Sequence, residues 1–415
     1  MQLIGPFKQL LAMNDLPIKG KLQDEDLPVV EQAGILIKDG RVEKIDEFEK
    51  LYKNYKEQLE SVEEIKGDLV ALPGFIDAHT HICFSGSRAK DYAMRNGGKS
   101  YLEIAREGGG IWDTVTKTRA ASQADLIEGI LQRIKQLLNN GITTIEVKSG
   151  YGLSVEEEYK MLKAIQLANK STFADLIPTC LAAHIFPKDY DGTITDYLVE
   201  ISEKLFPKMI AENLGNRVDA FIEEEAFSAQ IVAPYFQKAK SLGFDLTVHA
   251  DQFHTSGSEV AVNFEAVSAD HLEASSGKEI ELLAKSKVIP VALPGASIGL
   301  GCDFTPARKL LDLGASLAIA SDWNPGSAPM GDLLTQAAIL GTFEKLSNAE
   351  VLAGITFRAA AALRLNDRGR LEKGKLADIV AFPADHFNEI LYHQGQLKPS
   401  QTWKQGKGMK FINLD

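Results

Sequence analysis

Short apolar runs alternate with amphipathic stretches through the middle of the chain. Eight runs have the length and composition of β-strands, and they lie at 75–79, 142–148, 176–184, 218–224, 244–250, 266–271, 288–293 and 316–322. After the first, the runs are almost continuously apolar, which is typical of parallel strands that are covered on both faces. The pattern therefore predicts a parallel sheet inside the molecule.

Amphipathic helices are predicted between these runs. Residues 126–138 place leucine and isoleucine at helical spacing on one face, and similar windows lie at 155–168, 194–212, 230–241 and 278–286. Strands that alternate with helices in this way predict an α/β fold, a (β/α)8 barrel of the TIM type. A doubly wound open sheet is the alternative.

Both ends of the chain are rich in β-like sequence. The segment "GILIKDGRVEKI" places Asp39-Gly40 between alternating apolar residues, which predicts a hairpin over 34–45. The segment 369–382, with Gly369 and Gly374, has a similar texture and predicts short strands. We expect one small β-sandwich domain built from both termini beside the barrel, with bounds of 1–68 plus 366–415 and of 69–365. Two separate terminal hairpins are the alternative.

Composition narrows the class of protein. The chain has 415 residues, 45% of them apolar, and a formal net charge of −12, which argues against nucleic acid as a partner because phosphate binding needs a dense basic face. No run of about 18 apolar residues is present, so no membrane partner is expected. The first residues make a poor signal peptide. Three widely spaced cysteines, Cys83, Cys180 and Cys302, fit a reduced, cytoplasmic protein.

Histidines gather at the ends of the strand-like runs. His79 and His81 are two residues apart, and on a strand such residues project from the same side. Other runs end in His184, His249 and His271, and the last ends in Asp322. In a (β/α)8 barrel the carboxyl ends of the strands form one face, where catalytic groups collect. The pattern predicts a catalytic metal site there, with Asp322 and His271 as groups that move protons or polarise a carbonyl.

Longer motifs carry a resemblance to a known family. "GFIDAHTH" followed by His249, His271 and Asp322 resembles the amidohydrolase superfamily. Within it, the chain from about 75 to 330 is similar to the imidazolonepropionase family of histidine degradation. The motifs are "HTHICFSGSRAKDYAMRNGGKSYLEIAREGGGI", "EVKSGYGL", "AAHIFP", "VHADQF", "SADHLE", "LPGAS" and "ASDWNPGS". "KSGYGL" and "SDWNPGS" are the most specific.

The resemblance implies an activity and a set of site residues. The reaction is hydrolysis of the cyclic amide C–N bond of 4-imidazolone-5-propanoate to N-formimidoyl-L-glutamate, with one zinc or iron ion and a homodimeric assembly. The implied metal ligands are His79, His81, His249 and Asp322, and the implied substrate contacts are Arg88, Tyr151, His184, Gln252, Asn324, Gly326 and Ser327. His184 is also expected to stabilise the oxyanion. Alternatives are another cyclic-amide hydrolase or deaminase of the superfamily, and a non-catalytic scaffold protein.

Several further residues are assigned with alternatives open. The fork of Arg88 suits a propionate carboxylate. Gln252 is uncharged, so the proton carriers are expected to be Asp322 and His271, although which of them is the resting base stays open. Lys148 corresponds either to a bridging lysine of two-metal relatives or, more simply, to a buried salt bridge. The loop Gly108–Gly110 is expected to be a flexible loop of the active site, with Tyr101 beneath it. The acidic run Glu223–Glu225 lies either near the site or in a solvated patch.

Overall fold

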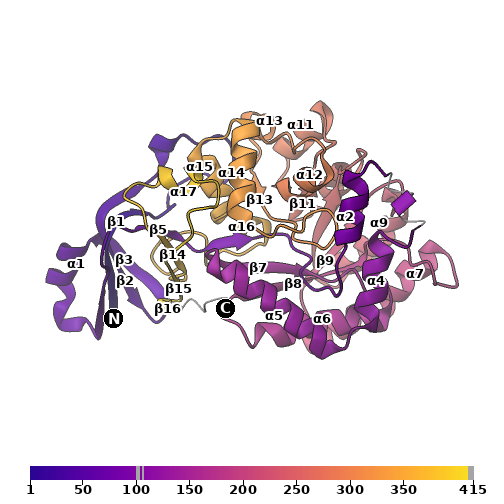
Figure 1. Cartoon of the computed structure of the whole chain (residues 1–415), viewed down its shortest axis with the longest axis horizontal. Coiled ribbons are helices and arrows are strands. Elements are labelled where there is room, and N and C mark those ends of the chain that lie inside the picture. Colours follow the sequence, from indigo (N-terminus) through magenta and orange to yellow (C-terminus); the bar gives the residue numbers. More distant parts are fainter. Residues whose placement is uncertain (100–102, 105–106, 410–415) are drawn as a thin grey trace.

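A parallel sheet of eight strands forms the centre of the molecule in the computed structural model, which describes residues 1–99, 103–104 and 107–409 (Figure 1). We call it the barrel sheet. Neighbouring strands follow one another in sequence order: β6 (Phe75–Asp77), β7 (Ile142–Lys148), β8 (Asp175–Ala183), β9 (Arg217–Phe221), β10 (Asp245–Ala250), β11 (Ser268–His271), β12 (Ile289–Ala292) and β13 (Ala318–Ile319). Each of the eight expected runs contains one strand, which confirms the predicted α/β fold.

The last strand lies beside the first, so the barrel sheet closes on itself. Thr80 and Trp323 form a parallel bridge just past the ends of β6 and β13. The Asp322 N–H donates to the His79 carbonyl at 3.0 Å, and the His81 N–H donates to the Trp323 carbonyl at 2.9 Å. A ring of parallel strands joined in this way is a barrel and not an open sheet.

Helices cover the outside of the barrel where the sequence predicts them. In α5 (Gln123–Asn139), Ser122 and Asp125 form a capping box, and the buried face presents Leu126, Ile130 and Ile134. The other helices that follow barrel strands are α6 (Val155–Asn169), α7 (Ile194–Glu200), α8 (Phe206–Glu212), α9 (Ala229–Ser241), α10 (Gly257–Asn263), α11 (Gly277–Lys285), α12 (Pro294–Leu300), α13 (Ala307–Asp312), α14 (Leu333–Glu344), α15 (Asn348–Gly354) and α16 (Phe357–Ala362). A π-helical turn, Ile201–Leu205, joins α7 to α8, and two more helices, α2 (Ala89–Asn96) and α4 (Ile111–Ala120), follow β6.

A second, mixed sheet combines both ends of the chain, and we call it the terminal sheet (Figure 1). The expected hairpin is confirmed, because β2 and β3 pair in antiparallel register up to Lys38 and Arg41 around the turn Asp39-Gly40. Helix α1 (Phe48–Tyr55) follows, and α17 (Asn388–Tyr392) lies near the other terminus. The strands are β1 (Gln2–Leu11), β2 (Val29–Lys38), β3 (Arg41–Glu47), β4 (Ser61–Glu64), β5 (Val70–Pro73), β14 (Ile379–Phe382), β15 (Gln401–Lys404) and β16 (Lys407–Gly408).

The strand expected in the C-terminal segment pairs with the N-terminal part of the chain, so the alternative of two separate terminal hairpins is wrong. The segment 369–382 forms one strand, β14, which pairs with β5 on one side and β15 on the other. Its earlier residues bond instead to the N-terminal strands, since the Leu371 N–H donates to the Ala12 carbonyl and the Gly374 N–H to the Val42 carbonyl. The two ends therefore form one sheet. The division into 1–68 plus 366–415 and 69–365 stays a proposal, and the terminal sheet itself runs on to Pro73.

The terminal sheet docks against the amino ends of the barrel strands. The Lys404 ammonium lies 2.6 Å from an Asp378 oxygen and 2.7 Å from an oxygen of Asp175, the first residue of β8. Arg368 also pairs with Asp175 and donates to the Thr144 hydroxyl in β7 at 2.9 Å. This contact leaves the opposite, carboxyl ends of the barrel strands clear of the terminal sheet.

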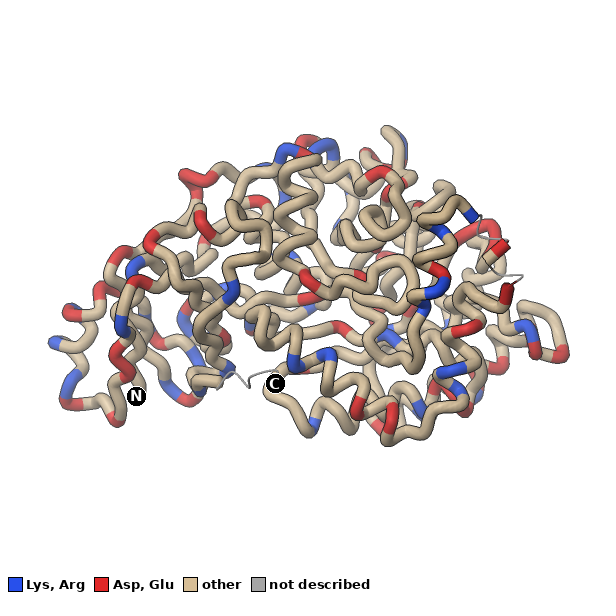
Figure 2. The backbone as a smooth tube through the Cα atoms, in the orientation of Figure 1, with Lys and Arg blue, Asp and Glu red and all other residues tan. Residues whose placement is uncertain are grey.

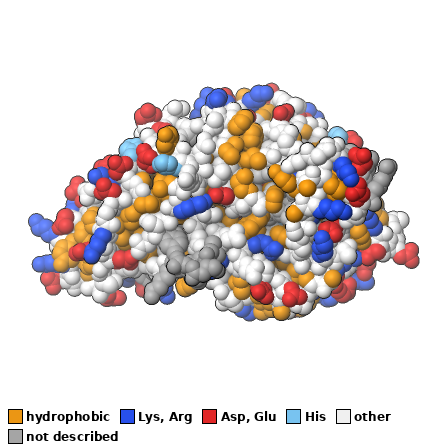
Figure 3. Space-filling view, in the orientation of Figure 1, with side chains coloured by type: hydrophobic (Ala, Val, Ile, Leu, Met, Phe, Trp, Pro, Cys, Tyr) orange, Lys and Arg blue, Asp and Glu red, His pale blue; other side chains and the backbone are white. Residues whose placement is uncertain are grey.

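The surface mixes both signs of charge. Figure 2 shows acidic and basic residues interleaved along the backbone, and Figure 3 shows them intermixed with apolar side chains on one face. Among the described residues, no helix combines the length and the hydropathy that a membrane-spanning helix needs.

Replacing Lys404 by Met tests the contact between the two sheets. Lys404 is 7% exposed, so its loss leaves Asp378 and Asp175 without their shared cation. We expect the free energy of unfolding, measured by urea denaturation, to fall by about 2–3 kcal/mol. This value is at the low end of the range for a buried pair, because Asp175 is partly exposed. Lys398→Met, which removes an exposed pair with Asp332, is the control and should change stability by less than about 1 kcal/mol.

Candidate active site and metal centre

Four side chains converge at the carboxyl end of the barrel. His79 and His81 follow β6, His249 lies in β10, and Asp322 follows β13. His81 Nε2 lies 3.2 Å from His79 Nε2 and 3.3 Å from His249 Nε2. Asp322 Oδ1 lies 3.5 Å from His79 Nε2 and 3.4 Å from His81 Nε2. Four potential ligand atoms from three distant parts of the sequence therefore face one small space.

Burial keeps these imidazoles neutral. It lowers the pKa of His79 and His81 well below the ordinary value for histidine, and it lowers the pKa of His249 to about 4. The His79 Nδ1–H donates to Asp270 Oδ2 at 2.7 Å, so the lone pair of Nε2 points into the site. His249 Nδ1 lies 2.9 Å from Asp219 Oδ2, and a carboxylate there favours a proton on Nδ1.

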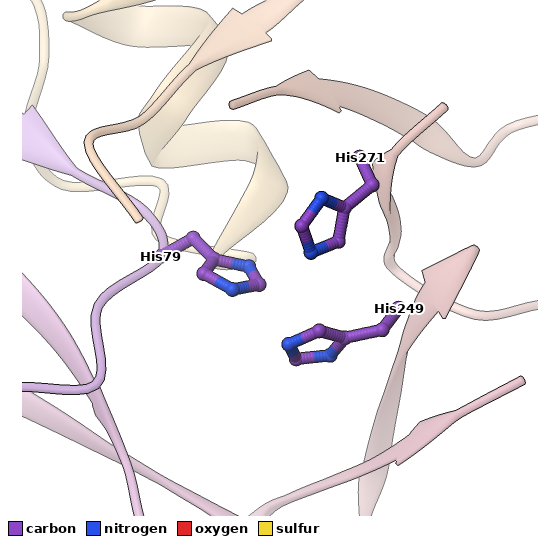
Figure 4. Close-up of side chains that lie close together, drawn as sticks. All are labelled: His79, His249 and His271. Atoms are coloured by element: carbon purple, nitrogen blue, oxygen red, sulfur yellow. The ribbon is translucent and has the colours of Figure 1, made fainter. Parts of the chain in front are cut away.

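The lone pair of His79 Nε2 faces the Nε2 atom of His81 and the carboxylate of Asp322, and a cation bound between these atoms would accept electron density from each. The donor set of neutral imidazoles and one carboxylate suits zinc, iron and other first-row metal ions. Two sets of three side chains bring their ligand atoms within 4.8 Å of one another. One set is His79, His81 and Asp322, and the other is His79, His249 and His271. Figure 4 shows the rings of His79, His249 and His271 turned toward a common centre. The residues present therefore fit a metal ion.

A buried lysine lies beneath these ligands. We call Lys148, Glu146, Asp219 and Asp270 the Lys148 cluster. The Lys148 ammonium lies 2.7 Å from Glu146 Oε1, 2.9 Å from Asp219 Oδ2 and 3.8 Å from Asp270 Oδ2, and all four side chains are at most 1% exposed. Burial alone lowers the pKa of Lys148, but the three carboxylates outweigh burial and raise it. The buried salt bridge is therefore the alternative that the structure supports for Lys148.

Each carboxylate of the Lys148 cluster also holds a segment that bears one or two of the converging histidines. Asp270 accepts from His79, and Asp219 lies against His249 and accepts its backbone N–H at 3.2 Å. Glu146 Oε2 accepts the backbone N–H of the residue between His79 and His81, also at 3.2 Å. Such partners fix the orientation of a ligating imidazole and strengthen metal binding.

The backbone around the site contains left-handed residues. Asp322 has φ 52° and His271 has φ 86°, a backbone conformation that residues other than glycine rarely adopt. The His271 imidazole lies 3.4 Å from a Glu273 oxygen. Burial lowers the pKa of His271, but the carboxylates of Glu273, Asp322 and Asp270 together more than offset burial and raise it. Strained backbone of this kind is concentrated at functional sites.

Aromatic rings extend the site away from the ligands. The rings of His81 and His184 lie 5.5 Å apart between centroids, and those of His184 and Tyr151 lie 5.4 Å apart. The His184 Nδ1–H donates to the Gly150 carbonyl at 2.9 Å, and burial lowers the pKa of His184 to about 4. A neutral His184 in this tautomer presents an acceptor at Nε2. The loop of Tyr151 is held by Glu158, whose carboxylate accepts three backbone N–H groups, those of Gly150, Gly152 and Leu153.

A polar loop follows β13 and connects Asp322 to Arg88. Asn324 Nδ2 donates to Asp322 Oδ2 at 2.9 Å, and Asn324 Oδ1 accepts the N–H groups of Gly326 and Ser327 at 2.8 Å each. The Arg88 guanidinium packs on Gly326, because a Cβ atom built there would lie 2.2 Å from Arg88 Nη1. The structure therefore brings the expected contact residues Arg88, Asn324, Gly326 and Ser327 together.

Other expected residues lie nearby in supporting positions. Gln252 is half-buried in the loop after β10. Glu223 is buried, accepts the N–H groups of Phe253 and His254, and lies 2.8 Å from His254 Nδ1, so it supports that loop. The adjacent Glu224 is 74% exposed, as a solvated patch would be. Tyr101 lies outside the described residues.

Sequence reasoning did not single out four acidic residues that hold the site together. They are Glu146, Asp219, Asp270 and, beside Arg88, Asp91. A signal for the first three was present, since each is a charged residue inside an otherwise apolar strand run. A buried charge needs a partner, and such residues in neighbouring strands are candidates for one another.

Replacing Lys148 by Met tests the role of the Lys148 cluster. Without the ammonium, the three buried carboxylates repel one another and release His79 and His249 from their fixed orientation. We expect the affinity for zinc to fall about 10- to 100-fold, measured by competition with a chelator. If Lys148→Met does not fold, Asp270→Asn takes its place, because it keeps the side-chain volume and leaves the Lys148 ammonium paired. This variant should also lower the affinity for zinc. Lys163→Met, on the outer helix layer, should leave zinc affinity unchanged.

Comparisons with known proteins agree with this geometry. A model of the amidohydrolase family matches residues 95–408. An imidazolonepropionase from Bdellovibrio bacteriovorus is 38% identical over 391 residues, 93% of this chain and 91% of that one, and an imidazolonepropionase from Acinetobacter baumannii is 41% identical, with 82% and 85% covered. The structure of an adenosine deaminase from Xanthomonas campestris with bound zinc aligns with a TM-score of 0.71 at 17% identity, covering 98% of this chain and 92% of that one. The chain belongs to the imidazolonepropionase family of the amidohydrolases.

Proposed function

We propose that this chain is an imidazolonepropionase, which hydrolyses the cyclic amide C–N bond of 4-imidazolone-5-propanoate to N-formimidoyl-L-glutamate. One observation carries the proposal: metal-ligating atoms converge on one side of His184 and Tyr151, and the guanidinium of Arg88 lies in the same site. This arrangement matches a substrate whose ring carbonyl lies at the converging ligand atoms and whose propionate lies at the Arg88 guanidinium. The similarity to named imidazolonepropionases supports the same activity.

The proposed metal ligands are His79, His81, His249 and Asp322, which would hold one ion, zinc or iron. When bound, the ion supplies a Lewis acid that makes water nucleophilic near neutral pH. The protein contributes neutral imidazoles, with carboxylates at the Nδ1 atoms of His79 and His249, and the carboxylate of Asp322. The Lys148 cluster supports a cation there, because it has three carboxylates for one ammonium.

Substrate orientation is assigned to the residues between Arg88 and the metal ligands. Arg88 would take the propionate carboxylate through its two terminal nitrogens, a bidentate geometry that arginine favours. Tyr151 and His184 would line one side of the substrate ring together, since their own rings are in contact, with centroids 5.4 Å apart. The remaining contacts are proposed from the loops after β10 and β13, by Gln252, Asn324, Gly326 and Ser327.

The tautomer of His184 changes one expected role. An oxyanion needs a hydrogen-bond donor, whereas His184 already uses its Nδ1–H on the Gly150 carbonyl and presents an acceptor. We therefore propose that His184 accepts a hydrogen bond from a ring N–H of the substrate. This interaction orients the ring and places its carbonyl toward the side of His81.

Proton transfer is assigned to Asp322 and His271. In the reaction the oxygen of water bonds to the ring carbonyl carbon, the bond from that carbon to the ring nitrogen breaks, and the nitrogen takes up a proton. Burial raises the pKa of Asp322 to about 7 in the metal-free protein. We assign its carboxylate as the group that accepts a proton from water and returns it to the nitrogen. His271, paired with Glu273, is placed to support the charge of Asp322.

The setting of the enzyme is also a proposal. We propose a cytoplasmic homodimer with a small-molecule substrate and with neither nucleic acid nor membrane as a partner. The free thiols of Cys83, Cys180 and Cys302 fit a reducing compartment.

A substrate panel tests the proposed activity. Protein reconstituted with zinc or iron should turn over 4-imidazolone-5-propanoate far faster than hydantoin, dihydroorotate or cytosine, followed by product formation at neutral pH. Chelation should abolish turnover and added metal should restore it. A preference for one of the other three compounds would instead identify a related hydrolase or deaminase, and no turnover of any would favour a scaffold protein.

Replacing Asp322 by Asn tests the proton carrier. The amide cannot accept and return a proton, so we expect turnover to fall about 10²- to 10⁴-fold or more, with the fold retained by circular dichroism. Asp46→Asn, an ion pair of the terminal sheet, is the matched control and should keep full activity. Near-normal turnover in Asp322→Asn would remove Asp322 from the proposed mechanism.

A further inference from the structure

Asp91 is a buried acid that the proposed reaction does not use. It lies in α2, three residues after Arg88, and is 4% exposed. Its Oδ2 atom accepts two hydrogen bonds, one from Arg88 Nε at 2.8 Å and one from the Gly110 backbone N–H at 2.8 Å. One carboxylate oxygen therefore joins the proposed propionate contact to the glycine loop Gly108–Gly110.

The bond to Nε has a consequence for the orientation of Arg88. A guanidinium is planar, and a carboxylate bound at Nε leaves both terminal nitrogens available for a second, bidentate partner. The opposite side of the Arg88 group is confined by Gly326, where a Cβ atom would lie 2.2 Å from Nη1 and 2.7 Å from Cζ. Arg88 is therefore held between Asp91 and the loop after β13.

The glycine loop is packed on the same carboxylate. A Cβ atom built on Gly109 would lie 2.5 Å from Asp91 Oδ1, so only glycine allows the backbone to approach this closely. The Gly110 N–H then donates to Oδ2, at the start of α4. Both oxygens of Asp91 are thus in contact with the loop, and Asp91 is buried there.

We infer that Asp91 is the positioning residue for Arg88 and thereby sets the preference of the site for substrates that carry a carboxylate at the end of a short chain. This inference rests on the proposed function, because it assigns the chemistry that Arg88 recognises. Asp91 acts through Arg88 and does not touch substrate. A free Arg88 side chain would adopt many rotamers, and fixing it beforehand removes that entropic cost from substrate binding.

The main experiment is a double-mutant cycle with Arg88→Ala, Asp91→Ala and the combination. For 4-imidazolone-5-propanoate, Asp91→Ala should lower kcat/KM about 10- to 100-fold, mostly through a higher KM, as expected when a binding group is misplaced. In the Arg88→Ala background, Asp91→Ala should cost less than about twofold further, because the arginine through which Asp91 acts on substrate binding is already removed. With 4-imidazolone, which lacks the propionate, Asp91→Ala should change kcat/KM by less than about twofold.

A binding measurement makes the test independent of turnover. Calorimetric titration with glutarate, a dicarboxylate of similar length, should show weaker binding to Asp91→Ala and to Arg88→Ala by the same factor. If the wild type binds glutarate in this way but does not hydrolyse the imidazolone, the proposed function fails while the role of Asp91 stands. Asp91→Asn, which keeps an acceptor oxygen but loses the charge, should be intermediate and replaces Asp91→Ala if that variant does not fold.

Controls separate positioning from general stability. Asp312→Ala removes a bond of the same kind and length, 2.8 Å from Arg308 Nε, at the surface of α13, and should change neither KM nor glutarate binding. Arg95→Ala tests the other arginine on which the charge of Asp91 acts. Three results would overturn the inference. The effects of Asp91→Ala and Arg88→Ala on kcat/KM could be additive, or the effect of Asp91→Ala could disappear only in the Arg95→Ala background. The third such result is an equal loss of kcat/KM for the propionate-free compound.

Discussion

The ammonium group of Lys148 balances three carboxylates that would otherwise repel one another in the closed interior of the barrel. Each of these carboxylates in turn fixes one part of the proposed metal site: the His79 ring, the backbone between His79 and His81, or His249. Charges buried this deeply are costly unless they are paired. The cost is compensated within one cluster, and the imidazoles receive their orientation from the same contacts.

A similar arrangement recurs around the substrate side of the site, with single carboxylates that hold loops. Glu158 accepts three backbone N–H groups of the loop that carries Tyr151, and Glu223 supports the loop that carries Gln252. Asp91 does the same for the glycine loop and Arg88. Loops are intrinsically variable in conformation, so a site assembled from several of them needs such internal supports. The contact residues are polar or aromatic, whereas their supports are acidic and buried.

The barrel could be predicted from local sequence patterns, because apolar runs alternate with helical windows along the chain and the barrel strands pair in that same order. The residues His79, His81, His249 and Asp322 could be assigned from their places at strand ends and from family resemblance. The pairing within the terminal sheet was harder to predict, since β14 pairs not only with its neighbour β15 but also with β5 from the other end of the chain. The supports were missed for a related reason: Asp219 and Asp270 gain meaning only beside Lys148, and no local pattern reveals which buried charges will be neighbours.

Closure of the barrel joins the beginning and the end of the catalytic unit. The backbone bonds from Asp322 to His79 and from His81 to Trp323 form only when the eighth strand arrives beside the first. In the proposed ligand set, His79 and His81 come from the first strand and Asp322 comes from the eighth. The backbone bonds at the seam therefore hold these three side chains in a fixed relation to one another.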